Sequence, residues 1–315
     1  MSVRIENNVV TGYEPELGVD EITIPEGVTE IAPRAFFASD LYKVNFPQSL
    51  KKVGESAFEF SRNLQYADLP DTVTDLEDRC FAVTGVHEVK IPKGVTVIKK
   101  GIYDGCMGYE TLTIPGWVTE IGELAFSANR GLKTVVIEEG VEKIGRRAFN
   151  GNPDLEDLSF PRSVKEVESY AFDGSGAPKS VTIPGNVKTV WFEAFCGNMG
   201  IREAILEEGV EEVDTRAFAY CKSLEKVTLP STLKKLNFRA FSGCTELSEI
   251  TIPEGVTEIP DYAFYACKRL TEITIPASVT KIGAKAFAGC KRLKKVNLPE
   301  HEIEIGADAF AGTLL

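Results

Sequence analysis

The chain has 315 residues, of which 43% are hydrophobic, and its formal net charge at pH 7 is −12. With an isoelectric point near 4.9, it is a poor partner for nucleic acid or an anionic membrane surface, because both would repel it. No stretch approaches the roughly 18 apolar residues of a membrane-spanning helix, and the N-terminus lacks the apolar run of a signal peptide. We therefore expect no membrane insertion, and a cytoplasmic location unless an export signal has been removed.

Residues 1–18 predict an N-terminal cap in the form of a small hairpin. Asn7 and Asn8 separate two short apolar stretches, and asparagine tolerates the positive φ that tight hairpin turns require. Such a hairpin would cover the open end of a repeat array, where an apolar core is otherwise exposed.

Residues 19–315 predict a single repeat array. An aromatic anchor returns every 23 residues, except for two intervals of 22. The thirteen anchors are Phe36, Phe58, Phe81, Tyr103, Phe126, Phe149, Phe172, Phe195, Phe218, Phe241, Phe264, Phe287 and Phe310. A fixed period of this length predicts a solenoid, in which each repeat forms one rung and buries its apolar side against its neighbours.

Each rung is expected to contain three parts, which the repeat around Phe287 shows clearly. A short strand places Ile273 and Ile275 inward, by the two-residue period of a strand. Pro276 then begins a turn, and a second extended piece ends at Ile282. About one helical turn follows and carries the anchor Phe287 into the core.

The string L-x-x-I-x-I-P-x-x-V-x-x-I-G-x-x-A-F-x-x-C resembles the BspA-like, or Treponema-type, leucine-rich repeat over residues 19–312. The resemblance implies a leucine-rich repeat solenoid of the α/β class, a right-handed horseshoe of about 13 rungs. Each rung would have short parallel strands and a single helical or 3-10 turn. Many relatives are bacterial surface proteins implicated in binding host or matrix proteins, and the family has no catalytic residues to transfer to this chain.

Five of the seven cysteines share one position, three residues after the anchor: Cys106, Cys221, Cys244, Cys267 and Cys290. In the other rungs this position holds Ser, Thr or Asn. A position that accepts all four residue types predicts a column of side chains that hydrogen-bond the backbone of a neighbouring rung. We therefore expect buried, reduced thiols, and no disulfide or zinc framework.

The sequence predicts no enzyme, no cofactor and no metal site. His87 and His301 belong to rungs nine apart, roughly 40 Å at about 4.8 Å per rung. No nucleophile elbow, zinc-protease or phosphate-loop motif occurs. The acid-rich stretch 203–214 lacks the spacing of a calcium loop, and is most simply a solvated face.

Outward positions that depart from the repeat are the candidates for a binding surface. Val136 and Ile205 stand where most rungs have an outward polar residue, and both rungs have Glu in place of Pro. Three rungs, about 14 Å, would separate the two side chains. The candidate protein-binding residues are Tyr66, Trp117, Val136, Trp191, Glu203 and Ile205. The structural alternative is that each tryptophan ring covers a neighbouring rung, and that Val136 and Ile205 pack under longer neighbours such as Glu203 and Lys226.

The leading hypothesis is a non-catalytic scaffold that binds another protein, such as a bacterial surface or adhesion-type recognition module. A structural or self-assembling repeat module with no ligand is the alternative, and an enzyme is a remote one. The last rung reads Pro299-Glu-His301-Glu-Ile303-Glu-Ile305, which shifts one apolar position by a residue, to Ile303, and it has no recognisable polar cap. Self-association through that end is therefore also open.

Overall fold

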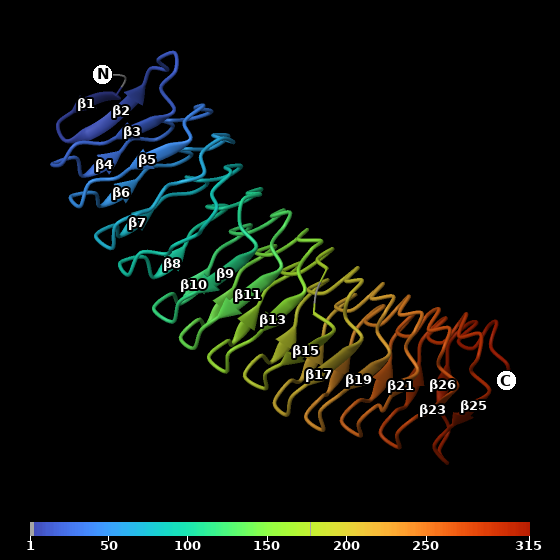
Figure 1. Cartoon of the computed structure of the whole chain (residues 1–315). Helices are drawn as coiled ribbons and strands as arrows, with labels where there is room; N and C mark the ends of the chain where they lie inside the picture. The colour runs from blue at the N-terminus through green and yellow to red at the C-terminus, as the bar shows by residue number, and fades with distance from the viewer. Residues whose placement is uncertain (1–2, 177) are drawn as a thin grey trace. The chain divides into compact units, whose positions relative to one another are not determined.

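The computed structural model describes residues 3–176 and 178–315 (Figure 1). They form two compact units, which divide between Asp154 and Leu155. The regular secondary structure of the described residues consists of short strands, and none of these residues lies in a helix. The described part of the chain accordingly has no helix long and apolar enough to cross a membrane.

The first unit contains an N-terminal hairpin followed by rungs with up to two short strands each (Figure 1). Its strands are β1 (Val3–Glu6), β2 (Val9–Tyr13), β3 (Glu21–Thr23), β4 (Glu30–Ile31), β5 (Lys43–Asn45), β6 (Lys52–Val53), β7 (Asp75–Leu76), β8 (Val97–Ile98), β9 (Thr111–Ile114), β10 (Glu120–Ile121), β11 (Thr134–Ile137) and β12 (Lys143–Ile144). The first strands pair in parallel as β3-β5 and β9-β11, and the second strands as β4-β6-β7 and β8-β10-β12.

The hairpin lies against the first rung. β1 and β2 are antiparallel, and the two residues between them, Asn7 and Asn8, have φ angles of 50° and 63°. β2 pairs in parallel with β4, and the Tyr13 ring lies 5.5 Å from the ring of Phe36. The hairpin thus covers the edge of the first rung, while the domain boundary expected after residue 18 stays a prediction.

The second unit repeats the same two-strand rung (Figure 1). Its strands are β13 (Asp157–Ser159), β14 (Glu166–Val167), β15 (Ser180–Ile183), β16 (Thr189–Val190), β17 (Glu203–Leu206), β18 (Glu212–Val213), β19 (Lys226–Thr228), β20 (Lys235–Leu236), β21 (Glu249–Ile250), β22 (Glu258–Ile259), β23 (Glu272–Thr274), β24 (Lys281–Ile282), β25 (Lys295–Asn297) and β26 (Glu304–Ile305). Parallel pairing joins β15-β17-β19-β21 and β23-β25, and also β16-β18-β20 and β22-β24-β26. Each pairing joins residues 23 apart in sequence, as in Ile273 with Val296.

The aromatic anchors form the centre of the core in each unit. In the first unit Phe36 and Phe58 stack with ring centroids 4.8 Å apart and planes within 3°. In the second, Phe241 lies 5.6 Å from Phe218 and 5.7 Å from Phe264, with planes within 7°. Because every rung places a ring at the same position of the repeat, the rings form a continuous stack in the core of each unit, as the period predicts.

The segment around each anchor is a run of turns, so the expected helical or 3-10 turn is wrong. The residues two before and two after the anchor have positive φ, as at Arg34 (58°) and Ala38 (54°) around Phe36. The amides of these two residues and of Phe36 donate to carbonyls of the next rung, whereas the amides between them donate three residues back in their own rung. An α-helix instead needs negative φ throughout and hydrogen bonds from residue i to i−4.

The rung spacing explains why a helix is excluded. Backbone hydrogen bonds join successive rungs at the anchor segment as well as at the strands, so both sides repeat at about 4.8 Å. An α-helix with its side chains is about 10 Å across, roughly twice that spacing. Consecutive turns are thin enough to stack, and they supply an inter-rung amide at every second residue.

The column three residues after the anchor hydrogen-bonds the backbone, as predicted. Ser61 Oγ donates to the carbonyl of Phe36 (2.8 Å), Asn198 Nδ2 to that of Phe172 (2.9 Å) and Cys244 Sγ to that of Phe218 (3.1 Å). All seven cysteines, which lie in the described residues, are unbridged and buried. Burial raises the pKa of Cys106 to about 11, so this thiol stays protonated at neutral pH.

Candidate protein-binding surface

The outward faces of the strands carry charged side chains that pair between adjacent rungs. Lys43 lies 2.8 Å from Glu21 on the first strands, and Lys52 lies 3.3 Å from Glu30 on the second strands. In the second unit Lys235 lies 2.9 Å from Glu212. Exposed pairs of this kind contribute only about 0.2–1 kcal/mol each. These pairs nevertheless balance charge along the faces. Exposed aromatic and apolar side chains are therefore the better candidates for a binding surface.

Tyr66 lies in a group of exposed rings at the start of the first strands of the first unit. Its ring centroid is 5.2 Å from that of Tyr42 and 5.7 Å from that of His87, both in edge-on arrangements. Tyr42 and Tyr66 are 39% and 42% exposed. His87 is held by contacts of Nε2 with Gln65 Oε1 (2.7 Å) and of Nδ1 with the Gly108 carbonyl (3.1 Å). The Tyr42–Tyr66–His87 cluster is therefore exposed but already ordered.

Sequence reasoning singled out Tyr66 and missed its two neighbours. The sequence does contain a signal for them. In the rungs on either side of Tyr66, Tyr42 and His87 each stand one residue before the position that matches Tyr66. Comparing positions one rung before and one rung after each candidate would have found the cluster.

Trp117 and Val136 lie apart from this cluster in the first unit. The Trp117 indole Nε1 donates to the carbonyl of Pro92 in the preceding rung at 3.2 Å, and the side chain remains 40% exposed. Val136 points outward from β11, where its partner on β9 is Thr113, and is also 40% exposed. Trp117 therefore covers a neighbouring rung, as the structural alternative expected, and both side chains still reach solvent.

In the second unit, Trp191 is exposed to the same extent, whereas Ile205 is half-buried between Thr182 and Thr228 of the adjacent strands. Glu203 lies 3.5 Å from Lys226. Val136 and Ile205 belong to different units, and the separation expected between them stays a prediction, as does their assignment to a binding site.

Four acids of the stretch from Glu203 to Asp214 pair with cations of other rungs. Glu211 lies 2.6 Å from Lys234, and the hydrogen bond to this lysine lowers the pKa of the glutamate. Glu207 lies 3.5 Å from Arg162. The stretch has no basic residue of its own, so its sequence alone suggests unpaired negative charge. In the structure, cations of other rungs balance much of this charge.

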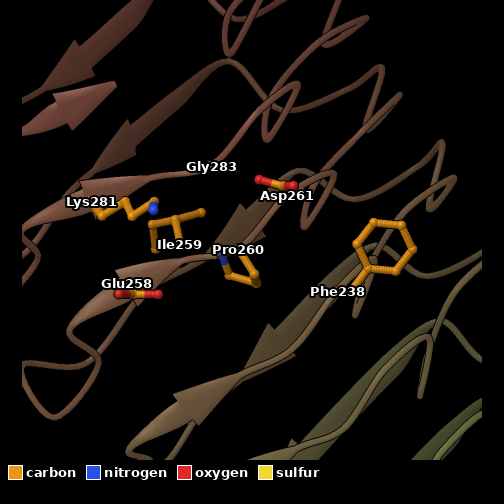
Figure 2. Close-up of a pocket in the computed structure, with 7 residues that line it drawn as sticks. All are labelled: Phe238, Glu258, Ile259, Pro260, Asp261, Lys281 and Gly283. Atoms are coloured by element: carbon orange, nitrogen blue, oxygen red, sulfur yellow. The ribbon is translucent and has the colours of Figure 1, made fainter. Parts of the chain in front are cut away.

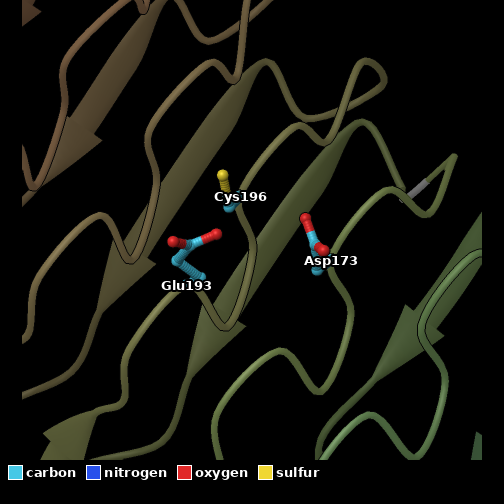
Figure 3. Close-up of side chains that lie close together, drawn as sticks. All are labelled: Asp173, Glu193 and Cys196. Atoms are coloured by element: carbon cyan, nitrogen blue, oxygen red, sulfur yellow. The ribbon is translucent and has the colours of Figure 1, made fainter.

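One cluster in the second unit has the ligand types of a metal site. The carboxylates of Asp173 and Glu193 and the Cys196 sulfur lie within 4.8 Å of one another (Figure 3). However, Arg216 Nη1 lies 2.8 Å from Glu193 Oε1 and supplies the positive charge that an ion would bring. Burial raises the pKa of Cys196 to about 12, which disfavours the thiolate that metals bind. The arrangement fits a half-buried ion pair better than a metal centre.

A shallow hollow of about 270 Å³ lies where the second strands of the second unit meet the anchor turns (Figure 2). Figure 2 shows Phe238 on one side of it and Glu258 and Lys281 on the other. Asp261 Oδ1 already accepts from the Ala284 amide at 2.7 Å, and Lys281 pairs with Glu304 at 3.3 Å. The hollow is smaller than an ordinary ligand pocket, and these two polar groups are engaged within the protein.

The repeat geometry agrees with a family match over almost the whole chain. Residues 13–133, 119–237 and 211–315 each match the model of the BspA type leucine rich repeat region, which spans six copies of the repeat. The chain belongs to the BspA-type leucine-rich repeat family. A comparison with curated proteins gives no match.

Solved structures share the fold of this BspA-type chain. A leucine-rich cell surface protein from Faecalibacterium prausnitzii is 26% identical, with a TM-score of 0.56 over 92% of this chain and 90% of that protein. A leucine-rich repeat protein from Bacteroides ovatus is 25% identical, with a TM-score of 0.59 over 91% and 89%. A leucine-rich repeat protein from Eubacterium ventriosum, 20% identical, has a TM-score of 0.62 over 98% and 88% and supports the fold alone.

This BspA-type chain is thus a parallel-strand solenoid homologous to bacterial surface repeat proteins. Proteins built from this repeat are generally scaffolds and not enzymes. The predicted family, the parallel strands and the rung count are confirmed, whereas the helical turn is corrected and the horseshoe curvature stays a prediction.

Proposed function

We propose that this chain is a non-catalytic scaffold that binds another protein, and that the Tyr42–Tyr66–His87 cluster is its main contact in the first unit. The observation that carries the proposal is the cluster itself: two tyrosine rings about 40% exposed and in mutual contact, beside the ion pair of Lys43 with Glu21. Tyrosine is among the residues most enriched in the energetic centres of protein interfaces.

The order already present in the cluster favours binding. A side chain that must be immobilised on binding costs about 0.5–1.5 kcal/mol. Here the edge-on contacts between the rings and the two polar contacts of His87 hold the side chains before a partner arrives. The two tyrosine hydroxyl groups hydrogen-bond each other, and one of them can still donate to a partner backbone while the ring faces cover apolar side chains.

Trp117 and Val136 in the first unit, and Trp191, Glu203 and Ile205 in the second, are proposed as secondary contacts. The exposure of Val136 and of both tryptophans supports this assignment, and the partial burial of Ile205 makes its share smaller. The likeness to a cell surface protein from Faecalibacterium prausnitzii supports the further proposal that this chain acts at a bacterial surface.

The experiment is a capture assay with a matched control. The immobilised chain is compared with a Tyr42→Ser, Tyr66→Ser variant in recovering proteins from an extracellular mixture, with quantification by mass spectrometry. The control is Tyr220→Ser, because Tyr220 is 39% exposed but lies in the second unit.

We expect the double variant to recover the partner at least about tenfold less well, which corresponds to about 1.4 kcal/mol, and the control to recover it fully. Equal recovery by the double variant would refute the cluster as the contact. Failure to enrich any protein over an unrelated acidic protein would refute the binding function. Val136→Asp with Ile205→Asp tests two of the secondary contacts, and full affinity in that variant would remove these two residues from the contact surface.

A further inference from the structure

The second unit has a strongly basic segment, in contrast to the rest of the chain. Between Tyr262 and Pro299 there are eight basic residues and a single acid, Glu272, so the segment carries a net charge of +7. Since the whole chain carries −12, the remaining residues carry −19. A local field of opposite sign to the rest of a protein favours a partner surface of complementary charge.

Arg269, Lys281 and Lys295 of this segment pair with acids of adjacent rungs, but two of its other cations are stacked on each other. Lys268 and Lys291 occupy the same position of adjacent rungs, 23 residues apart, as Glu272 and Lys295 do in the parallel pairing of β23 and β25. Their spacing is about 4.8 Å, close enough for like charges to repel. Lys268, Lys291 and Arg292 are all exposed, and among the described residues none of the three forms an ion pair.

Two tyrosine rings belong to the same rung as Lys268. Tyr265 is three residues before Lys268, is 41% exposed, and has its ring centroid 5.6 Å from that of Tyr262. The guanidinium of Arg239 lies 4.7 Å from the Tyr262 ring centroid on the preceding rung. We call Tyr265, Lys268, Lys291 and Arg292 the basic surface. It offers unpaired positive charge beside an exposed ring, which suits an acidic segment that also has an apolar side chain.

The first unit contains such a segment. The loop Glu14–Asp20 follows β2 and reads Glu-Pro-Glu-Leu-Gly-Val-Asp, with every residue exposed. Leu17 is fully exposed to solvent. Glu16 and Asp20 form no ion pair with another described residue, and Glu14 has only a 3.8 Å contact with the exposed Arg4.

We infer that copies of this chain associate head to tail, with the acidic loop Glu14–Asp20 of one copy docked on the basic surface of another. Glu14 and Glu16 face the stacked cations, and Leu17 covers the ring of Tyr265. A long polyanion fits less well, because the basic segment covers only about two rungs and the remaining −19 would repel the rest of the polymer. The two surfaces differ, so the interface is heterologous and each copy can bind one further copy at either surface.

The test is sedimentation equilibrium of the full chain at low and at high salt. Three variants are compared with the wild type: Lys268→Glu with Lys291→Glu, Glu14→Lys with Glu16→Lys, and the control Arg130→Glu. Arg130 is exposed and occupies the same position of the repeat as Lys268, four residues after its anchor, but has no stacked cation.

We expect the wild type and the control to exceed the monomer mass of 34.5 kDa as concentration rises at low salt, and less so at high salt. Each charge-reversal variant should associate at least about tenfold more weakly alone, and mixing the two should restore association between them. A monomeric wild type at low salt, association unchanged by either variant, or no rescue in the mixture would overturn the proposal. So would capture of poly-glutamate by a chain that does not self-associate.

Discussion

Replacing Phe241 with alanine tests whether the stacked anchors stabilise the solenoid. The Phe241 side chain is fully buried, and its ring lies between those of Phe218 and Phe264 at 5.6 and 5.7 Å. Burial of a phenylalanine side chain is worth about 1.5–3 kcal/mol, and each ring contact adds about 0.5–1.5 kcal/mol. The neighbouring rungs are held by backbone hydrogen bonds and cannot collapse into the space. We therefore expect a loss of about 3–5 kcal/mol in the free energy of unfolding.

Urea melts of the wild type and the variant measure this loss, and Phe310→Ala provides the matched comparison. Phe310 is half-buried and has one stacked neighbour in the described residues, Phe287 at 5.4 Å. Its replacement should cost about half as much as that of Phe241. A loss below about 1 kcal/mol for Phe241→Ala, or equal losses at the two positions, would refute the assignment of the anchor stack as the core.

Three further predictions follow from the same geometry. Cys244→Asn should cost about 1 kcal/mol, because asparagine makes the equivalent hydrogen bond at Asn198, and mass spectrometry of unreduced protein should find no bridged peptides. Burial raises the pKa of Cys106 from 9.0 to about 11. The protonated thiol therefore contributes fully to stability below pH 9, and this contribution falls by about 1.4 kcal/mol per pH unit up to about pH 11. Melts at alkaline pH should show a smaller loss of stability for Cys106→Thr than for the wild type. Val136→Asp should change the free energy of unfolding by no more than about 0.5 kcal/mol, whereas Val135→Asp should lower it by more than about 3 kcal/mol, since Val135 is buried and Val136 is exposed. Equal losses of stability in the two variants would contradict the register of β11.

The sequence was sufficient for the features that every rung repeats. The period of 23 identified the anchors, the inward position of Ile273 and Ile275, and the hydrogen-bonding column, because each is a property of one position averaged over many rungs. The prediction of a helical turn was wrong because the local sequence is compatible with two conformations. An Ala-Phe pair after a glycine fits one turn of helix or a pair of tight turns equally well, and only the spacing between rungs decides between them.

The candidate site was less predictable, because it depends on contacts between rungs. The outward direction of Val136 followed from strand alternation, but the partial burial of Ile205 depends on its neighbours on two adjacent strands. The acids near Glu211 looked unpaired because their cations come from residues about 23 positions away. The Tyr42–Tyr66–His87 cluster was missed as a group for the same reason, since its members are 21 and 24 residues apart.

All of these assignments require that residues one repeat apart are direct neighbours, and a cross-link tests this requirement most directly. Thr113 on β9 and Val136 on β11 are paired across adjacent rungs, at a distance compatible with a disulfide. We predict that Thr113→Cys with Val136→Cys forms a bridge under mild oxidation, whereas Thr111→Cys with Val136→Cys, displaced by two residues, does not. A bridge in the displaced pair, with none in the matched pair, would contradict the register of the solenoid and every neighbour assignment that rests on it.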